Sequence, residues 1–278
     1  MKHEIVNGLE LPKVGFGTWK IGGGASADHR SDKKSLAALL SALELGYTHF
    51  DTAEMYAGGH AEELLGQALR DSGIRREGLF ITTKVSPEHL DYTSVLAGCE
   101  ASLGRLGVEY VDLYLIHWPS RLMKLEESFR ALNKLVGDGK VRHLGVSNFG
   151  LSLLERSREL SETPILTNQV PLSMLDRKYV RNGMLAYCQA NAIVLTAYSP
   201  FEAGKFRASR VLADVAKRYS ATPHQIALAW LCNQPRVITI PMSFDAAHQS
   251  ENIDAADISL SPQDLAQLGQ TPASGTRQ

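Results

Sequence analysis

The 278-residue sequence is poor in cysteine, and this scarcity limits the classes of protein to which it can belong. Cys99, Cys188 and Cys232 are isolated and odd in number, so they predict neither a disulfide framework nor a zinc site. Isolated thiols suit a reducing compartment, and we therefore expect a cytoplasmic protein. We also find no cluster of residues with the spacing of metal ligands, and we predict that no metal is bound.

The sequence also lacks a surplus of one charge and any long apolar run. Its 29 Lys and Arg residues stand against 30 Asp and Glu residues, which gives a formal net charge of -1. This balance gives no indication of a nucleic acid or a membrane surface as partner. The N-terminal residues show no apolar segment of a signal peptide, and no apolar run reaches the length of a membrane span.

What the sequence does contain is a regular alternation of strand and helix patterns after an N-terminal hairpin. Asn7-Gly8 separates two short apolar runs, 4–6 and 9–11, and both residues tolerate the positive φ of a hairpin turn. The strands expected after this hairpin are 14–19, 47–51, 79–84, 111–117, 142–146, 165–169, 193–198 and 237–241. The expected helices are 32–45, 61–71, 93–106, 123–136, 151–160, 177–190, 209–218, 223–232, 246–252 and 262–268.

Eight strand-helix units at this length predict a fold of the α/β class. Repeated units with short loops favour parallel strands, and eight of them favour a (β/α)8 TIM barrel with the N-terminal β-hairpin as an addition. Barrels of this size form one domain, so we expect a single domain over residues 1–278. The alternative is an open doubly wound sheet, which usually carries a G-x-G-x-x-G turn that this sequence lacks.

Polar or aromatic residues stand at the C-terminal end of nearly every expected strand. In a barrel these ends form the face that carries function. The residues at these ends are Thr18 and Trp19, Asp51, Lys84, His117, Ser147 and Asn148, Gln169, Tyr198 and Ser199, and Met242 and Ser243. A single residue of these types often caps a turn or fills the core, so it is their recurrence at one face that indicates a site.

Lys84 is the residue that distinguishes a catalytic site from a set of capping residues. A lysine that closes the apolar strand 79–84 should not be buried without a partner, and Asp51 on the neighbouring strand is the candidate. A fixed positive charge beside Tyr56 would favour its phenolate, so we expect its pKa to fall from about 10. Tyr56 is then a candidate general acid for a carbonyl oxygen, and His117 could hydrogen-bond the same oxygen.

Spaced motifs along essentially the whole chain resemble those of the aldo-keto reductase superfamily. They are GFGTW at 15–19, FDTAEMY at 50–56, ITTK at 81–84, LIHWP at 115–119, GVSNF at 145–149, NQ at 168–169, AYSP at 197–200 and IPMS…EN at 240–252. Chance could supply one or two such motifs, but not the whole series in this order.

The resemblance implies a barrel reductase that binds an extended nicotinamide cofactor without a Rossmann domain. Tyr56 would protonate the carbonyl oxygen while hydride passes to the carbonyl carbon. The catalytic tetrad that it implies is Asp51, Tyr56, Lys84 and His117. The substrate-pocket residues that it implies are Trp19, Tyr56, His117 and Trp118. The cofactor-binding residues that it implies are Thr18, Trp19, Asp51, Ser147, Asn148, Gln169, Tyr198, Ser199, Pro200, Phe201, Ile240, Met242, Ser243, Phe244, Asp245, His248, Glu251 and Asn252.

The sequence departs from the family pattern where the 2′-phosphate of the cofactor is held. The pattern has a lysine and an arginine at positions that Met242 and His248 occupy here, with Asp245 between them. Charge-assisted contacts with a phosphate contribute roughly 1.5–3 kcal/mol each. We therefore expect NADP(H) as cofactor with relaxed or mixed use of NAD(H), a weak pH-dependent contact from His248, and Lys205 and Arg207 as candidate replacements.

The expected reaction is the reversible NAD(P)H-dependent reduction of an aldehyde or ketone to an alcohol. Short loops at 120–125 and after 268 suggest small substrates such as methylglyoxal-like dicarbonyls, aromatic aldehydes and short aldoses. One alternative is a redox-sensing or regulatory barrel that binds cofactor without turnover, although such a barrel would not need Tyr56 and Lys84 together. Another is a Schiff-base enzyme with Lys84 as nucleophile. The resemblance implies a monomer.

Overall fold

A computed structural model describes residues 2–202 and 206–270. Its strands are β1 (His3–Val6), β2 (Leu9–Pro12), β3 (Phe16–Gly17), β4 (His49–Asp51), β5 (Phe80–Val85), β6 (Val111–Ile116), β7 (Val141–Ser147), β8 (Ile165–Pro171), β9 (Val194–Tyr198) and β10 (Val237–Thr239). Its α-helices are α1 (Asp32–Glu44), α2 (His60–Ser72), α3 (Tyr92–Leu106), α4 (Leu125–Gly137), α5 (Leu151–Leu160), α6 (Lys178–Arg181), α7 (Met184–Ala190), α8 (Arg210–Arg218), α9 (Pro223–Cys232), α10 (Ala246–Asp254) and α11 (Pro262–Gly269). Its 3-10 helices are η1 (His29–Ser31), η2 (Tyr56–Gly59), η3 (Arg76–Gly78) and η5 (Ala255–Asp257).

The N-terminal hairpin forms as the Asn-Gly pair predicts. Strands β1 and β2 pair antiparallel, with Val6 opposite Leu9. The two turn residues, Asn7 and Gly8, have φ values of 51° and 81°. Both values lie in the left-handed region, which the two-residue hairpin turn requires. The prediction of a hairpin is therefore confirmed.

The other eight strands form one sheet in which each strand lies beside its neighbours in sequence, from β3 to β10. The pairs β3–β4, β4–β5, β5–β6, β6–β7 and β9–β10 are parallel. Val14, just before β3, forms a parallel bridge with Thr239 of β10. A doubly wound sheet reverses its strand order at a switch point, and this sheet does not. The predicted (β/α)8 barrel with an N-terminal hairpin is confirmed.

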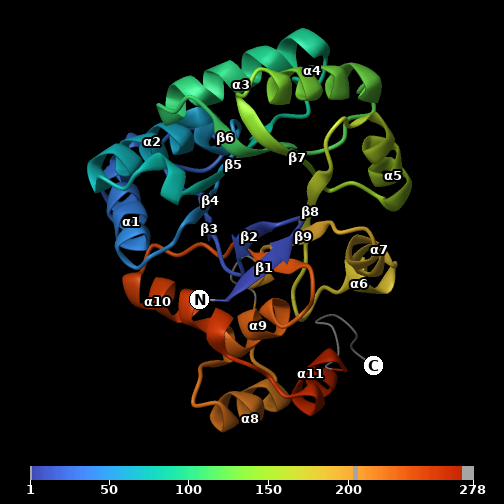
Figure 1. Ribbon diagram of the computed structural model, residues 1–278. Coiled ribbons are helices and arrows are strands. Elements are labelled where there is room, and N and C mark those ends of the chain that lie inside the picture. Colours follow the sequence, from blue (N-terminus) through green and yellow to red (C-terminus); the bar gives the residue numbers. More distant parts are fainter. Residues whose placement is uncertain (1, 203–205, 271–278) are drawn as a thin grey trace. The chain divides into compact units, whose positions relative to one another are not determined.

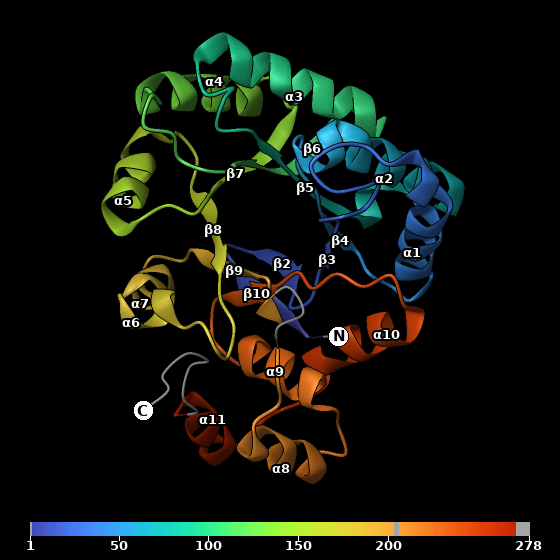
Figure 2. The same cartoon turned by 180° about the vertical axis from the view of Figure 1, so that it is seen from behind.

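The chain groups into two compact units, each of which is described by itself. One unit comprises Phe16–Asn168 and Met242–Ala246, and the other comprises Met1–Gly15, Gln169–Pro241 and Ala247–Gln278. Within the first unit, helices α1 to α5 lie outside strands β3 to β7 in both views (Figures 1 and 2). The expected single domain over residues 1–278 stays a prediction.

Helix α3 shows how local sequence sets the ends of these helices. The Asp91 carboxylate accepts a hydrogen bond of 3.0 Å from the Ser94 backbone N–H, which caps the first turn. Gly107 ends the helix with a φ of 67°, a value that glycine adopts without strain. Between these ends one face is buried, at Val95, Cys99, Ser102, Leu103 and Leu106.

The structure corrects two of the expected elements. The helix expected over 177–190 is divided into α6 and α7, because Gly183 has a φ of 84° that an α-helix cannot contain. The Asn182 side-chain oxygen accepts a hydrogen bond of 3.1 Å from the Met184 N–H and so begins α7. The strand expected over 14–19 is reduced to Phe16–Gly17, although Val14 still contributes an isolated bridge.

The three cysteines are buried, and none of them forms a disulfide. Burial raises the pKa of the Cys99 and Cys232 thiols to about 12, so both remain protonated and unreactive. In residues 2–202 and 206–270, no helix is long and apolar enough to cross a membrane.

The burial of His49 in β4 leads us to expect a loss of stability in mild acid. Its side chain is buried, with Nε2 3.0 Å from the Thr82 hydroxyl, and burial lowers its pKa to about 4. Between about pH 6.5 and pH 4, His49 therefore binds a proton in the unfolded chain but stays neutral in the folded chain. We expect His49 to reduce the free energy of unfolding by about 2 kcal/mol between pH 7 and pH 5.

Urea unfolding of wild type and His49→Gln at pH 7 and pH 5 measures this effect. The change in unfolding free energy between pH 7 and pH 5 should be smaller in His49→Gln than in wild type. It should be unchanged in His3→Gln, which alters an exposed histidine. An equal pH dependence in wild type and His49→Gln would contradict the prediction.

Candidate active site

A buried ion pair lies at the ends of β4 and β5. Lys84 Nζ lies 2.6 Å from Asp51 Oδ1 and donates a second hydrogen bond of 2.6 Å to the Thr52 carbonyl oxygen. The exposed fractions of the two side chains are 0% for Lys84 and 2% for Asp51. Burial acts to lower the pKa of Lys84, but the Asp51 carboxylate and the Tyr56 hydroxyl raise it above its usual value. The expected pairing of Lys84 with Asp51 is confirmed, and the ammonium remains charged.

Tyr56 stands at the start of η2, directly beside this pair. Lys84 Nζ donates a hydrogen bond of 3.3 Å to the Tyr56 hydroxyl oxygen, and lies 4.9 Å from the centre of its ring. The expected fall in the pKa of Tyr56 is wrong. Burial raises the pKa above 10, and the charge of Lys84, which acts to lower it, does not outweigh burial and the opposing charge of Asp51. The phenol therefore holds its proton throughout the neutral range.

His117 follows β6 and faces the same tyrosine. The rings of His117 and Tyr56 meet edge to face, with centroids 5.5 Å apart. Burial, with a smaller contribution from Lys84, lowers the pKa of His117 to about 3, so the imidazole is neutral at physiological pH. Its Nδ1 atom is buried and has no hydrogen-bond partner among the described residues. A neutral imidazole can donate one hydrogen bond to a ligand oxygen.

Two tryptophans lie near the rim of this group. Trp19 contacts the Tyr56 ring edge to face, with centroids 5.2 Å apart. The exposed fractions of Trp19 and Trp118 are 48% and 45%, which is large for aromatic side chains. Exposed aromatic surface beside a polar cluster is typical of a ligand-binding site. Their expected role in the substrate pocket stays a prediction.

The end of β7 brings a hydroxyl and an amide next to His117. Ser147 is fully buried, and Asn148 has a φ of 64°, a conformation that asparagine tolerates better than most residues. Asn148 Nδ2 donates hydrogen bonds to the His117 carbonyl oxygen at 3.1 Å and to Ser147 Oγ at 2.9 Å. Asn168, which was not predicted as a site residue, is fully buried and donates to the Phe149 carbonyl oxygen at 3.1 Å.

The segment Met242–Ala246 belongs to the same unit and lies against α1. Lys34 Nζ lies 4.5 Å from the centre of the Phe244 ring, a cation–π contact. Ser243 Oγ accepts a hydrogen bond of 3.0 Å from the Asp245 N–H. Lys34 was not predicted as a site residue, because it stands far before Phe244 in the sequence and only the fold brings the two together.

The remaining predicted cofactor residues belong to the other unit. Tyr198 and Ser199 line a hollow of about 460 Å³, together with residues of the segments 171–176, 181 and 202. Lys205, one candidate replacement cation, lies outside the described residues, whereas Arg207 is exposed and donates to the Phe206 carbonyl oxygen. In this set Gln169, Pro200, Ile240 and Asn252 are buried. Tyr198, Phe201 and Glu251 are partly buried, and Ser199 and His248 are exposed.

The sequence left open whether Lys84 assists Tyr56 in carbonyl reduction or forms a Schiff base itself. The geometry around Lys84 distinguishes between these two reactions. A Schiff-base nucleophile needs a neutral amine that a substrate can reach. Lys84 is fully buried and is held as an ammonium by Asp51. Its arrangement instead suits a fixed charge that acts on Tyr56.

Comparison with known proteins gives a consistent result. Residues 13–271 match the model of the aldo/keto reductase family. Glyoxal reductase of Bacillus subtilis (strain 168) is 37% identical over 263 residues, which cover 94% of this chain and 89% of the relative. A methylglyoxal reductase of Escherichia coli (strain K12) is 37% identical over 266 residues, covering 94% of this chain and 90% of the relative.

Solved structures agree with these sequence matches. A thermostable aldo-keto reductase crystallised with the inhibitor epalrestat superposes with a TM-score of 0.93 at 42% identity, covering 97% of this chain and 99% of its own. An aldo/keto reductase from Klebsiella pneumoniae, in complex with NADP and acetate, superposes with a TM-score of 0.86 at 33% identity, covering 100% and 98%. The chain therefore belongs to the aldo/keto reductase family of NAD(P)H-dependent oxidoreductases.

Proposed function

We propose that this protein reduces small aldehydes, dicarbonyl compounds above all, to alcohols with a nicotinamide cofactor. The observation that carries the proposal is the hydrogen bond between Tyr56 and the buried, charged Lys84. This contact gives a neutral phenol a permanent positive charge beside its oxygen. Such a phenol can release a proton to a substrate and remain stabilised as a phenolate afterwards.

We assign the proton transfer in reduction to Tyr56. Its raised pKa keeps the hydroxyl protonated at neutral pH, so the acid is present before the substrate arrives. As the hydroxyl gives its proton to the carbonyl oxygen, the developing phenolate is stabilised by Lys84, and Asp51 keeps that lysine charged. Neutral His117 donates a hydrogen bond to the same carbonyl oxygen and orients it.

The residues at the end of β7 fit a nicotinamide. Ser147 and Asn148 bring a hydroxyl and an amide beside His117, and both groups can bond a carboxamide. When bound, the nicotinamide supplies the hydride. For Gln169 and Tyr198, the family resemblance implies a carboxamide contact and stacking on the nicotinamide ring, and both assignments stay predictions.

The substrate class rests on the relatives and on the tryptophans. The two relatives described above are named for glyoxal and methylglyoxal, which are small dicarbonyl compounds. The half-exposed Trp19 and Trp118 offer apolar surface at the rim, while Tyr56 and His117 offer two donors to one oxygen. We propose small dicarbonyls as the preferred substrates, with aromatic aldehydes and short aldoses as further candidates.

An aldehyde screen tests this function. Loss of NADPH absorbance would be followed with glyoxal, methylglyoxal, an aromatic aldehyde and a short aldose. We expect the dicarbonyls to give a kcat/KM at least about ten times that of the aldose, since the open rim gives a sugar few additional contacts. Absence of turnover with every aldehyde would contradict the proposal and favour the regulatory barrel that binds cofactor without reacting.

Cofactor preference gives a second test, and it centres on Lys34. We propose mixed use of NADPH and NADH, with Lys34 supplying the positive charge that Met242 does not. Lys34 is exposed, so its contact with a 2′-phosphate should be weaker than that of a buried cation. We expect Lys34→Met to lower kcat/KM for NADPH by about three- to tenfold and to leave the value for NADH unchanged.

The neighbouring Lys33 offers a matched control. It is also an exposed lysine of α1, and Lys33→Met removes the same charge without touching the contact with Phe244. Equal losses with NADPH and NADH, or equal losses in Lys33→Met and Lys34→Met, would contradict the role of Lys34. A wild-type preference for NADPH above about a thousandfold, roughly 4 kcal/mol, would contradict mixed use.

A further inference from the structure

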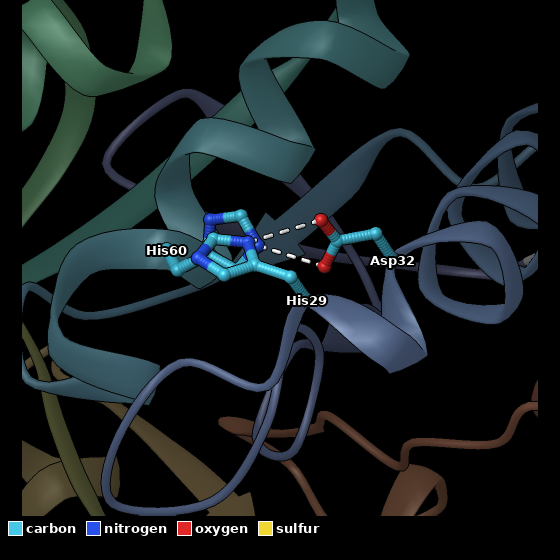
Figure 3. A group of neighbouring side chains, drawn as sticks. All are labelled: His29, Asp32 and His60. Carbon is cyan, nitrogen blue, oxygen red and sulfur yellow. Dashed lines mark hydrogen bonds and ion pairs between the residues drawn. The ribbon is translucent and has the colours of Figure 1, made fainter.

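Three side chains from separate elements meet beside the loop that precedes α1 (Figure 3). His29 belongs to η1, Asp32 is the first residue of α1, and His60 is the first residue of α2. His60 Nε2 lies 2.8 Å from Asp32 Oδ1, and His29 Nδ1 lies 3.3 Å from Asp32 Oδ2. One ligand atom of each residue lies within 4.8 Å of the others.

These three residues present the donor atoms of a transition-metal site. Zn²⁺ binds imidazole nitrogen at about 2.0–2.1 Å and carboxylate oxygen at about 2.0–2.2 Å, commonly with three protein ligands and one open position. Tetrahedral geometry at these bond lengths separates ligand atoms by about 3.3–3.6 Å. The separations of 2.8 Å to Asp32 Oδ1 and 3.3 Å to Asp32 Oδ2 are near this range, and the three ligand atoms lie within 4.8 Å of one another, so side-chain movements would bring them around one ion.

Glu63 supplies the outer partner that metal-binding histidines commonly have. Its Oε2 atom lies 2.7 Å from His60 Nδ1, the ring nitrogen that faces away from Asp32. A carboxylate in this position holds Nδ1 protonated and leaves Nε2 to bind a metal. The carboxylates of Asp32 and Glu63 together also balance the charge of a divalent cation.

A simple ion pair does not explain the whole arrangement. A protonated His60 between Asp32 and Glu63 accounts for two of the contacts, but not for His29. The His29 side chain is 73% exposed, yet its ring lies edge to face against His60, with centroids 4.4 Å apart, and its Nδ1 faces the same carboxylate. Arg30, the cation of the same turn, pairs with Asp28 instead of Asp32.

We propose that His29, Asp32 and His60 form a binding site for a divalent transition metal of the Zn²⁺ class, with water at the open position. The sequence shows no such site, because His60 stands 28 residues after Asp32 and only the folded chain brings them together.

The proposed ion would join the loop before α1 to the start of α2. Gly22 of this loop already packs on His60, where a Cβ at position 22 would lie 2.9 Å from the imidazole Cδ2. The Gly22 N–H also donates a hydrogen bond of 3.0 Å to Ser35 Oγ of α1. Bound metal should therefore stabilise the folded chain by mass action.

Cobalt binding to the full chain without an affinity tag, after treatment with a chelator, tests the site. We expect one Co²⁺ per chain with visible ligand-field absorption, displacement of Co²⁺ by Zn²⁺, and a rise in Tm with Zn²⁺. His29→Ala should weaken Co²⁺ binding at least tenfold and clearly reduce the rise in Tm at the same Zn²⁺ concentration. Because His29 is exposed, this variant should keep the fold, and the metal-free variant should unfold at the wild-type Tm.

A matched control and an outer-partner variant complete the test. The exposed His89 has its Nδ1 atom 3.0 Å from Glu54 Oε1, and among residues 2–202 and 206–270 this pair belongs to no group of three candidate metal ligands, so His89→Ala should leave Co²⁺ binding unchanged. Glu63→Gln should weaken it by about 10- to 100-fold. Absence of ligand-field absorption at one equivalent, or equal binding by wild type and His29→Ala, would show adventitious surface binding only and overturn the proposal.

Discussion

Replacing Tyr56 by phenylalanine is expected to lower kcat for aldehyde reduction by about 10²- to 10⁴-fold, the range that general acid catalysis contributes. The substitution removes one oxygen atom and keeps the ring that contacts Trp19 and His117. Lys84 loses one hydrogen bond but keeps those to Asp51 and Thr52, so the fold should remain intact. The loss should therefore appear in kcat, with little change in cofactor binding.

Steady-state rates and cofactor titration measure this effect. Cofactor binding, followed by quenching of protein fluorescence, should be similar in wild type and Tyr56→Phe. Tyr92→Phe makes the same chemical change at a partly buried tyrosine of α3 and should leave kcat unchanged. Equal turnover by wild type and Tyr56→Phe would remove Tyr56 from the role of acid.

Replacing Lys84 by methionine is expected to cost about 3–5 kcal/mol of unfolding free energy and to abolish turnover. The reason is that Asp51, whose side chain is 2% exposed, would keep a buried negative charge without its cation. The double variant Asp51→Asn/Lys84→Met removes both charges and should recover much of the stability, because replacing a whole buried pair is often nearly neutral. It should not recover activity, since Tyr56 would still lack its neighbouring charge.

Urea unfolding and activity assays separate the two effects. A control is available on the surface, where Lys134 pairs with Asp138 four residues later at 3.0 Å, and the two side chains are 48% and 38% exposed. Lys134→Met should leave the free energy of unfolding nearly unchanged, because water and salt screen an exposed ion pair. If Lys84→Met were as stable as wild type, or if the double variant regained activity, the assigned role of the buried pair would be wrong.

The fold was predictable because its determinants are local and repeated. The Asn7-Gly8 turn and the alternation of strand and helix patterns can be read from short windows of sequence. The division of the helix expected over 177–190 could also have been foreseen, since Asn182-Gly183 is a turn signal. One continuous helix was expected because the residues on both sides of this pair have a helical pattern.

The pairing of Lys84 with Asp51 was predictable for a different reason. A lysine at the end of an apolar strand cannot be buried alone, so its presence demands a carboxylate on a neighbouring strand. The pKa of Tyr56 was not predictable in the same way. Its direction depends on the balance between burial and the charges of Lys84 and Asp51, and only the folded positions of all three determine that balance.

The sequence by itself determined the family, the barrel and the buried pair, because each rests on local patterns or on the chemistry of one residue type. Only the tertiary structure brought Lys34 to Phe244, and His29 and Asp32 to His60. These contacts join residues far apart in the chain on outer helices and loops, where no periodic pattern constrains the side chains. The proposed cofactor preference and the proposed metal site both depend on such contacts, so the sequence alone could indicate neither Lys34 nor the metal ligands.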